Sequence, residues 1–287
     1  MSSPRVWLIT GSSTGFGRNM VEYALSQGEK VVATLRTPSA LDDLRAQFPP
    51  TQLHIVPLDI TDRAAISAAF AAAKAAFGRV DVVFNNAGVV HVAEIEGTPD
   101  AVAREMFAVN FWGAADVARE AVRFFREENP AGAGGWLLNV SSITGVQPLT
   151  AVGYYSSSKA AFDAFTQALA AEVDPAWNIK VVGILPDFFR TPIAVKGPVI
   201  PPHPAYVATT AEARRHIAVS FDPHGGVRIG NPKKAMPRIF ALTRLAKPPV
   251  RLFLGHTAVE DARIKIKSLS EDVEAYAAWS EGLLEDE

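Results

Sequence analysis

The sequence contains no cysteine among its 287 residues. A chain without cysteine forms no disulfide, binds no metal through thiolates and offers no thiol nucleophile. Its histidines show neither the His-x3-His nor the His-Glu-x-x-His spacing of zinc enzymes, so we expect no catalytic metal. These histidines are His54, His91, His203, His216, His224 and His256. His91 follows an Asn-Ala-Gly turn and is interpreted as an ordinary loop histidine or as a residue that lines a pocket.

Long apolar runs and a strong net charge are also missing. No stretch approaches the 18 apolar residues of a membrane-spanning helix, and the run Val6–Ile9 is too short for the core of a signal peptide. The formal net charge of −2 provides no basic field for binding a nucleic-acid backbone. We therefore expect a cytoplasmic protein with a small-molecule partner, without a membrane span and without a nucleic-acid role.

Apolar residues make up 48% of the chain and charged residues 20%, which is typical of a globular protein and not of a disordered one. The length permits one domain or two. No linker or internal repeat is visible, and the run Val250–Leu254 would add a seventh strand late in the chain. We expect a single domain over 1–287, with a cofactor-binding part over about 1–150 and a catalytic and substrate part over about 135–287.

Short β-branched runs alternate with longer helical patterns. The predicted strands before the late run are Val6–Thr10, Val31–Thr34, Leu53–Val56, Val80–Phe84, Trp136–Val140 and Ile179–Ile184. The predicted helices are Gly17–Gln27, Ala40–Gln47, Asp62–Phe77, Phe111–Glu128, Tyr155–Glu172, Ala211–Val219 and Lys233–Ala246. Such alternation favours parallel pairing through right-handed crossovers. The sequence predicts an α/β fold, with a doubly wound, mostly parallel Rossmann-like sheet of about seven strands, helices on both faces and a C-terminal helical extension.

The segment after the sixth strand is rich in proline, which breaks regular structure. It contains Pro186, Pro192, Pro198, Pro201, Pro202 and Pro204. We expect a loop or lid that ends near Thr209.

A glycine-rich turn follows the first strand directly and opens into a helix. It reads Thr10-Gly11-Ser12-Ser13-Thr14-Gly15-Phe16-Gly17. Glycines let the backbone approach a pyrophosphate, whose charge is attracted by free N–H groups at the helix N-terminus. The alternative is a turn of the same composition that binds nothing.

Tyr155 and Lys159 are four residues apart, which places both on one face of a helix. Such a pair also occurs on helices that bind nothing. Ser142 precedes Tyr155 by 13 residues and follows the end of a predicted strand, at the sheet edge where open α/β sheets bind ligands. The neighbouring Tyr154 has Ser158 in place of the lysine, so we expect it to be a packing residue or part of the pocket wall. Ser141 should point away from Ser142, so we expect it to be structural or to lie near the cofactor.

Over roughly Val6–Thr191 the chain resembles the short-chain dehydrogenase/reductase family. The match in order and spacing consists of Thr10-Gly-x3-Gly-x-Gly17, Asp59, Asn85-Asn86-Ala87-Gly88, Asn110, Ser142 and Tyr155-x3-Lys159. One departure is Asp187, which stands where the family usually has glycine after the proline that ends the sixth strand.

The resemblance implies a role for each matched residue. Tyr155 would be the general acid or base, Ser142 would hold the carbonyl oxygen, and Lys159 would bind the ribose and lower the pKa of the tyrosine. Asn110 would extend a water-linked proton relay, and Asp59 would meet the adenine. The expected cofactor-binding set is Gly11, Ser13, Thr14, Gly15, Phe16, Gly17, Arg36, Asp59, Ile60, Asn86, Ala87, Gly88, Tyr155, Lys159, Pro186 and Thr191.

The end of the second strand predicts the coenzyme. NAD-selective sites carry an acidic residue there, whereas this strand runs Val31-Val-Ala-Thr-Leu-Arg36 without a carboxylate. Arg36 can hold a 2′-phosphate through charge-assisted hydrogen bonds, and resembling NADP-preferring proteins carry a base at this place. We therefore expect NADP(H) as cofactor. The alternative is a solvated surface arginine.

The expected function is that of an NADP(H)-dependent carbonyl reductase or alcohol dehydrogenase. The alternatives are a non-catalytic NADP(H)-binding sensor or scaffold, and a dehydratase or epimerase on the same site. A mostly apolar substrate is indicated by Phe188, Phe189, Ile193, Val195 and Tyr206. Many resembling proteins pair through the helices that correspond to Phe111–Glu128 and Tyr155–Glu172, so we expect a homo-oligomer, a dimer or tetramer, unless the C-terminal segment covers that surface.

Overall fold

The structure, a computed structural model, describes residues 3–195, 200–222 and 229–284. Its centre is a sheet of seven parallel strands in the order β3-β2-β1-β4-β5-β6-β7. The strands are β1 (Val6–Thr10), β2 (Lys30–Leu35), β3 (Leu53–Pro57), β4 (Val82–Asn85), β5 (Gly135–Val140), β6 (Ile179–Pro186) and β7 (Arg251–Leu254). The predicted doubly wound sheet is confirmed, and because β7 pairs with β6 the late strand belongs to the same single domain.

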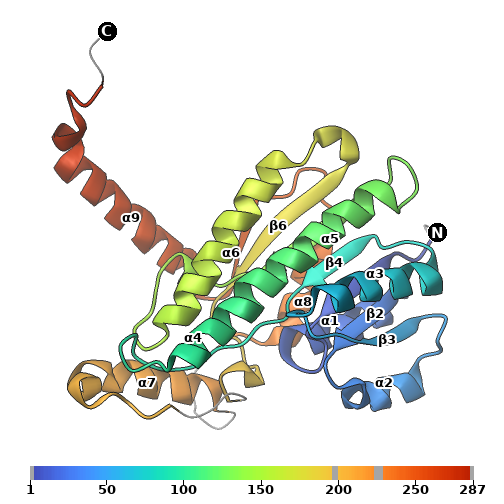
Figure 1. The fold of residues 1–287 in the computed structure, drawn as a ribbon, viewed down its shortest axis with the longest axis horizontal. Helices are drawn as coiled ribbons and strands as arrows, with labels where there is room; N and C mark the ends of the chain where they lie inside the picture. The colour runs from blue at the N-terminus through green and yellow to red at the C-terminus, as the bar shows by residue number, and fades with distance from the viewer. Residues whose placement is uncertain (1–2, 196–199, 223–228, 285–287) are drawn as a thin grey trace.

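Two helical layers cover the sheet (Figure 1). Successive side chains of a strand point to opposite faces, so Trp7 and Ile9 pack into one apolar core while Val6 and Leu8 pack into the other. The first core is completed by α1 (Gly15–Ser26), α2 (Asp42–Gln47) and α8 (Pro232–Leu242). The second is completed by α3 (Arg63–Phe77), α5 (Ala114–Glu127) and α6 (Gly153–Glu172).

The helix predicted from Phe111 begins earlier than expected. In the structure α4 (Asp100–Phe107) continues through a π-helical turn, Ala108–Gly113, into α5. Only Ala103 and Met106 of α4 are buried, so the helix offers a short apolar face to the core. The π turn widens the helix where Gly113 passes Ile60, whose carbonyl oxygen would lie 2.6 Å from a β-carbon at Gly113. Widened turns of this kind are frequent at functional sites.

The proline-rich segment is more ordered than predicted. It forms 3-10 turns at Pro192–Val195 and Pro204–Tyr206, and α7 (Val207–Phe221) starts before Thr209. The next helix, α8, ends at Leu242 rather than at Ala246 because its last turn is closed by the Thr243 side chain, which donates to the Phe240 carbonyl at 2.8 Å. Pro198 and His224 lie outside the described residues.

The C-terminal extension is the helix α9 (Ala258–Tyr276), followed by a 3-10 turn at Ala277–Ser280. Figure 1 shows α9 leaving the body of the protein and projecting away from it. Its first turn alone is buried, through Ala258 and Ala262. Across the ranges that the structure describes, no helix has the length and apolar character needed to span a membrane.

Candidate active site

A cleft of about 380 Å³ crosses the carboxyl edge of the sheet. Residues that follow β1, β2, β3, β4, β5 and β6 all line it. The middle of the cleft lies between β1 and β4, where the strand order reverses, and open α/β sheets bind dinucleotides at this point. Apart from Gly17 and Asn110, every predicted catalytic or cofactor-binding residue lines this cleft.

The glycine-rich turn takes a shape that other residues resist. Gly11 and Gly15 have φ angles of +67° and +57°, in the left-handed region that favours glycine. A β-carbon at Gly17 would lie 2.2 Å from the Gly11 carbonyl oxygen. Gly17 therefore lies beneath the turn, where it permits close packing of α1, and Gly15 begins α1 beside the cleft.

The Asn-Asn-Ala-Gly segment is fastened to the end of β1. Thr10 Oγ1 accepts hydrogen bonds from the backbone N–H groups of Asn86 and Ala87 at 2.9 and 3.0 Å. The Asn86 side chain donates to the Thr10 carbonyl at 2.9 Å. These bonds leave little space between the two segments, since a β-carbon at Gly11 would lie 2.8 Å from the Ala87 Cα. The floor of the cleft is thus fixed across the switch point.

Arg36 and Asp59 lie at the end of the cleft beyond β2 and β3. Asp59 Oδ1 accepts bonds from the Thr61 N–H at 2.9 Å and the Thr61 hydroxyl at 2.8 Å. The Thr61 N–H holds the pKa of the Asp59 carboxyl below its usual value, with a smaller contribution from the positive charge of Arg36. Arg36 itself is exposed, so a ligand phosphate can reach its guanidinium.

Ser142, Tyr155 and Lys159 meet in the part of the cleft that lies between β5 and α6. Ser142 Oγ accepts bonds from the backbone N–H and the hydroxyl of Thr144, at 3.2 and 3.0 Å. Burial raises the pKa of the Tyr155 phenol, and its hydrogen bond with Ser142 offsets only part of that rise. The phenol is therefore protonated at neutral pH in this state of the protein.

Lys159 is held beside the tyrosine by the end of β5. Its Nζ donates to the Val140 carbonyl at 2.9 Å and lies 6.0 Å from the centroid of the Tyr155 ring. Burial is the largest cause of the raised pKa of Tyr155, so the lowering of that pKa by Lys159 remains a prediction. Burial also lowers the pKa of Lys159 itself to about 8.

The Asn110 side chain forms hydrogen bonds with the Val89 backbone and with Ser158. Its amide accepts from the Val89 N–H and donates to the Val89 carbonyl, each at 2.8 Å, and also donates to Ser158 Oγ at 3.1 Å. The side chain therefore orients the Val89 backbone beside the cleft. The water-linked proton relay through Asn110 remains a prediction.

Asp187, the departure from the family pattern, caps α9. Its Oδ2 accepts from the backbone N–H of Thr257 at 2.7 Å and from that of Ala258 at 3.3 Å. It sits against Gly255, whose φ is +130° and whose β-carbon would lie 1.9 Å from Asp187 Oδ1. The carboxylate thus joins the end of β6 to the C-terminal extension. The sequence could not show this, because the partners are 70 residues away.

Apolar side chains line the far end of the cleft, beside Ser142 and Tyr155. They include Val90, Leu149, Val152, Phe188, Ile193 and Ile217. Phe189 also lines the cleft, but it packs against Phe16 of the glycine-rich turn instead. Tyr206 does not join them as predicted, because its hydroxyl donates to Glu96 at 2.7 Å on the surface. The side chain of Val195 lies outside the described part of the structure.

Sequence reasoning overlooked a polar pair in this apolar wall. His91 is 5% exposed, and its Nε2 lies 3.3 Å from a carboxylate oxygen of Glu105 on α4. Both residues line the cleft. Glu105 gave no signal in the sequence because α4 itself was not predicted.

A buried ion pair holds α7 against the loop after β4. Glu94 is 4% exposed and forms a two-pronged bond with Arg214, at 2.7 and 2.6 Å. The Thr210 hydroxyl and the His203 N–H also donate to its carboxylate. Arg214 holds the pKa of Glu94 far below its usual value. This ion pair therefore fixes the position of α7 at the apolar far end of the cleft.

Comparison with known proteins defines the class of this site. Residues 5–197 match the family model described as short chain dehydrogenase. An uncharacterized oxidoreductase of Schizosaccharomyces pombe is 34% identical over 281 residues, which are 98% of this chain and 92% of that protein. The chain belongs to the short-chain dehydrogenase/reductase family, a family of oxidoreductases.

Solved structures agree with this assignment. A short-chain dehydrogenase from Streptomyces avermitilis superimposes with a TM-score of 0.87 at 35% identity, covering 98% of this chain and 99% of that one. A short chain dehydrogenase/reductase from Burkholderia phymatum, solved in complex with NAD, gives a TM-score of 0.79 at 25% identity, covering 94% of this chain and 95% of that one.

Proposed function

We propose that the protein is an NADP(H)-dependent oxidoreductase that transfers a hydride between the nicotinamide and a carbonyl or secondary alcohol of a mostly apolar small molecule. The observation that carries the proposal is the meeting of Ser142, Tyr155 and Lys159 in one cleft at the switch point of the sheet. A dinucleotide in that cleft would lie beside all three side chains. The apolar far end supports the substrate class.

The residues present fit a nicotinamide dinucleotide. Gly11, Gly15 and Gly88 leave open the space that side chains would otherwise fill, since a β-carbon at Gly88 would lie 3.5 Å from Lys159 Nζ and 3.2 Å from Asn110 Oδ1. The N-terminus of α1 favours the negative charge of a pyrophosphate. When bound, the nicotinamide supplies or accepts the hydride. Pro186 and Thr191 line the cleft, and they would lie beside the carboxamide end of the nicotinamide.

The protein's own residues manage the proton and the substrate oxygen. Because Thr144 donates to Ser142 Oγ, the Ser142 hydroxyl can direct its own proton toward a substrate oxygen. Tyr155 is protonated at neutral pH, so it can donate its phenolic proton when a carbonyl is reduced. Lys159 remains largely charged at pH 7 and stabilises the phenolate that this transfer leaves.

The choice of NADP(H) over NAD(H) rests on the end of β2. The chain places Arg36 there and no carboxylate before Asp42 on α2. A 2′-phosphate would therefore meet a positive charge in the cleft and no repulsion. The Burkholderia phymatum protein was solved with NAD, so the preference of this chain needs its own measurement.

The test is oxidation of NADPH, followed by its absorbance, with a panel of aromatic, alicyclic and aliphatic ketones and aldehydes. We expect turnover with the larger apolar compounds. The Tyr155→Phe variant should lose at least about 10³-fold in kcat, because only the transferable proton is removed, while its NADPH affinity stays within a few fold.

Tyr154→Phe is the matched control, since it removes the same atom one residue away. It should retain most of the activity. Turnover by Tyr155→Phe equal to that of the control would contradict the proposed role. Coenzyme binding without turnover of any carbonyl or alcohol would favour a sensor or scaffold, and a product unchanged in oxidation state would favour a dehydratase or epimerase.

A further inference from the structure

The helix α9 carries apolar side chains that no described residue covers. Ile266, Val273 and Tyr276 are 66%, 62% and 60% exposed, and Leu269 is 50% exposed. Figure 1 shows why, because the helix leaves the body after its first turn. An exposed apolar stripe of this length on a projecting helix marks an interaction surface rather than a set of isolated surface residues.

The apolar residues follow the spacing of a coiled coil. We define the α9 seam as Val259, Ala262, Ile266, Leu269, Val273 and Tyr276. Its members are separated by 3, 4, 3, 4 and 3 residues, the repeat that keeps one stripe of a helix facing a partner helix. The first position of each repeat is β-branched: Val259, Ile266 and Val273. The seam is therefore built to meet another helix.

The same chain cannot supply that helix by folding α9 back. The first turn of α9 packs against Ile143, Val146 and Phe253, and Asp187 accepts hydrogen bonds from the N–H groups of Thr257 and Ala258. These contacts fix the direction of the helix as it leaves the body. The seam beyond Ala262 therefore points away from the rest of the described chain.

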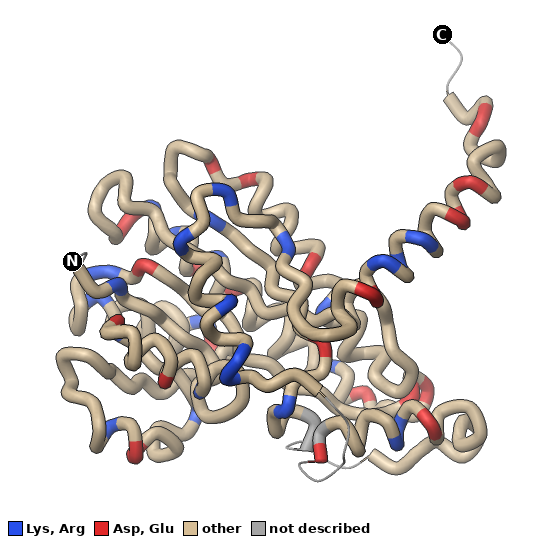
Figure 2. The backbone as a smooth tube through the Cα atoms, turned by 180° about the vertical axis from the view of Figure 1, so that it is seen from behind, with Lys and Arg blue, Asp and Glu red and all other residues tan. Residues whose placement is uncertain are grey.

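The charges on α9 identify the partner. The first turn of α9 carries Glu260 and Asp261, and the next two turns carry Arg263, Lys265 and Lys267. The outer half carries Glu271, Asp272 and Glu274 (Figure 2). The basic segment complements the acidic outer segment of a second copy only when the two helices run in opposite directions. An anionic membrane would instead repel the acidic half.

We propose that α9 pairs with α9 of a second copy of this chain as an antiparallel coiled coil. In the register that the seam defines, Ile266 faces Leu269 of the second copy and Val259 faces Tyr276, whereas Ala262 stays packed against the body of its own chain. Lys265 then lies beside Asp272 of the second copy on both sides of the two-fold axis. The 19 residues of α9 span about 28 Å, so the contact is small and its strength depends on concentration.

The experiment is sedimentation velocity of the full chain from about 1 to about 100 μM, where weak self-association becomes visible. We expect Ile266→Glu to halve the mass reached at the highest concentration. Ile264→Glu is the matched control, because Ile264 is also exposed but lies on the same helix outside the seam. Both variants place a glutamate at a solvent-exposed position of the helix, so circular dichroism should show that both are folded.

A charge exchange tests the direction. Lys265→Glu and Asp272→Lys should each weaken association at least about threefold, and the double variant should restore it, because each pair is rebuilt across the antiparallel contact.

Equal masses for the unmutated chain, Ile266→Glu and Ile264→Glu would overturn the proposal, as would failure of the double variant to recover. Flotation of the chain with anionic vesicles, lost in Ile266→Glu without a change in mass, would assign the seam to a membrane instead. None of these readouts depends on the proposed enzymatic function.

Discussion

Lys159 brings an ammonium group into the cleft almost fully shielded from water, at 3% exposure. The Val140 carbonyl is the hydrogen-bond partner of its Nζ in the described structure, and no carboxylate is paired with it there. Burial therefore disfavours the charged form, which is why its pKa falls to about 8. Burying this charged ammonium lowers the stability of the folded protein. The proposed catalytic role of Lys159 would explain why the residue is there.

We predict that Lys159→Met is inactive yet more stable than the unmutated protein at pH 7. The folded pKa of about 8 lies below the unfolded value of 10.5, so the unfolded chain binds more protons between those pH values and the unmutated protein gains stability as pH rises through them. Below pH 8 the cost is fully present, up to about 3 kcal/mol at 1.36 kcal/mol per pKa unit. The orphaned Val140 carbonyl offsets about 1 kcal/mol of the gain, which leaves about 2 kcal/mol.

Urea unfolding of both proteins at pH 6.5, 8 and 9.5 measures this difference. The gap should narrow as pH rises above 8. A gap that stays constant across the three pH values would show that the charge of Lys159 carries no such cost.

We predict that the coenzyme preference depends on the single residue Arg36. A hydrogen bond to a charged group contributes about 1.5 to 3 kcal/mol, so the unmutated protein should favour NADPH over NADH by about 10- to 150-fold in kcat/KM. Arg36→Ala should remove most of that preference. Arg45→Ala is the control, because Arg45 is exposed on the neighbouring helix and pairs with Asp42. A higher kcat/KM with NADH than with NADPH in the unmutated protein would contradict this role of Arg36.

The residues that could be predicted are those whose position follows from the strand they end. Arg36 directly follows β2 and Ser142 lies two residues after β5, so the carboxyl edge of the sheet places both in the cleft. Lys159 was predicted as a neighbour of Tyr155 from helical spacing, but its bond to Val140 depends on how α6 packs on β5. Spacing gives the face of a helix and not the partner of a side chain.

Two elements meet at Asp187. Its carboxylate satisfies backbone N–H groups at the start of α9 that helix geometry leaves without intrahelical partners. We predict that Asp187→Ala lowers the free energy of unfolding by about 1 to 2 kcal/mol and that Asp187→Asn recovers part of the loss, since an amide oxygen also caps a helix. Hydrogen exchange should show faster exchange at Thr257 and Ala258 in the alanine variant. Unchanged exchange there would contradict the capping role.

At the level of elements, the strands and most of the covering helices were predictable, whereas α4 and the full length of α7 were not. The strands are buried on both faces, so their continuous apolar runs mark them clearly. The short α4 buries only Ala103 and Met106, and α7 is held by the ion pair between Glu94 and Arg214, which are 120 residues apart. Long-range polar pairing leaves no periodic trace in a sequence, so both helices were missed or shortened.

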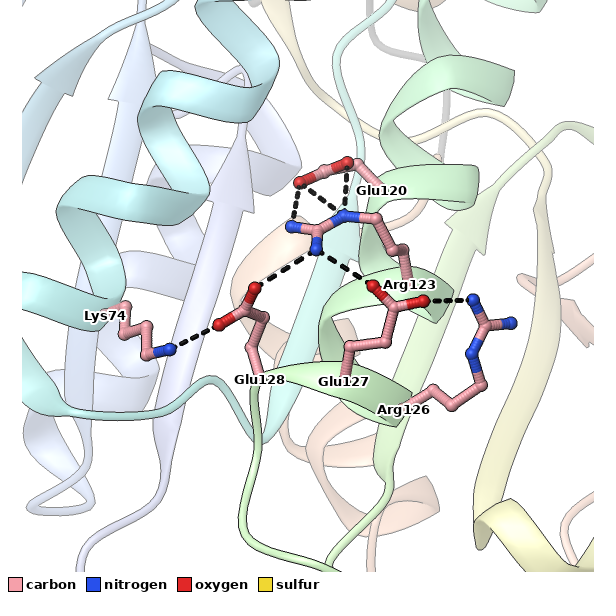
Figure 3. A network of polar contacts seen from close by, with 6 residues as sticks. All are labelled: Lys74, Glu120, Arg123, Arg126, Glu127 and Glu128. Atoms are coloured by element: carbon pink, nitrogen blue, oxygen red, sulfur yellow. Dashed lines mark hydrogen bonds and ion pairs between the residues drawn. The ribbon is translucent and has the colours of Figure 1, made fainter.

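The whole molecule offers two surfaces on which copies could associate. The expected homo-oligomer through α5 and α6 remains a prediction. The outer face of α5 holds a network in which Arg123 contacts Glu120, Glu127 and Glu128, and Lys74 of α3 contacts Glu128 (Figure 3). These charges satisfy one another within one chain, so burying them against a second copy would cost desolvation without new partners.

Coenzyme binding should stabilise the entire fold, because the cleft joins the ends of six of the seven strands. A ligand that binds only the folded state at 100 times its Kd adds about 2.7 kcal/mol, which for a chain of this size corresponds to a rise of about 5 °C in Tm. We predict that rise for NADPH. NADH at the same concentration, bound 10- to 150-fold more weakly, should add at most about 1.4 kcal/mol and therefore at most half the rise.

Arg36→Ala should reduce the NADPH shift to the NADH value, whereas Tyr155→Phe should keep it, because the phenol is not needed to hold a phosphate. Thermal unfolding with each coenzyme, repeated after dialysis to remove it, measures these shifts. Equal shifts from both coenzymes in the unmutated protein would place the 2′-phosphate outside the reach of Arg36.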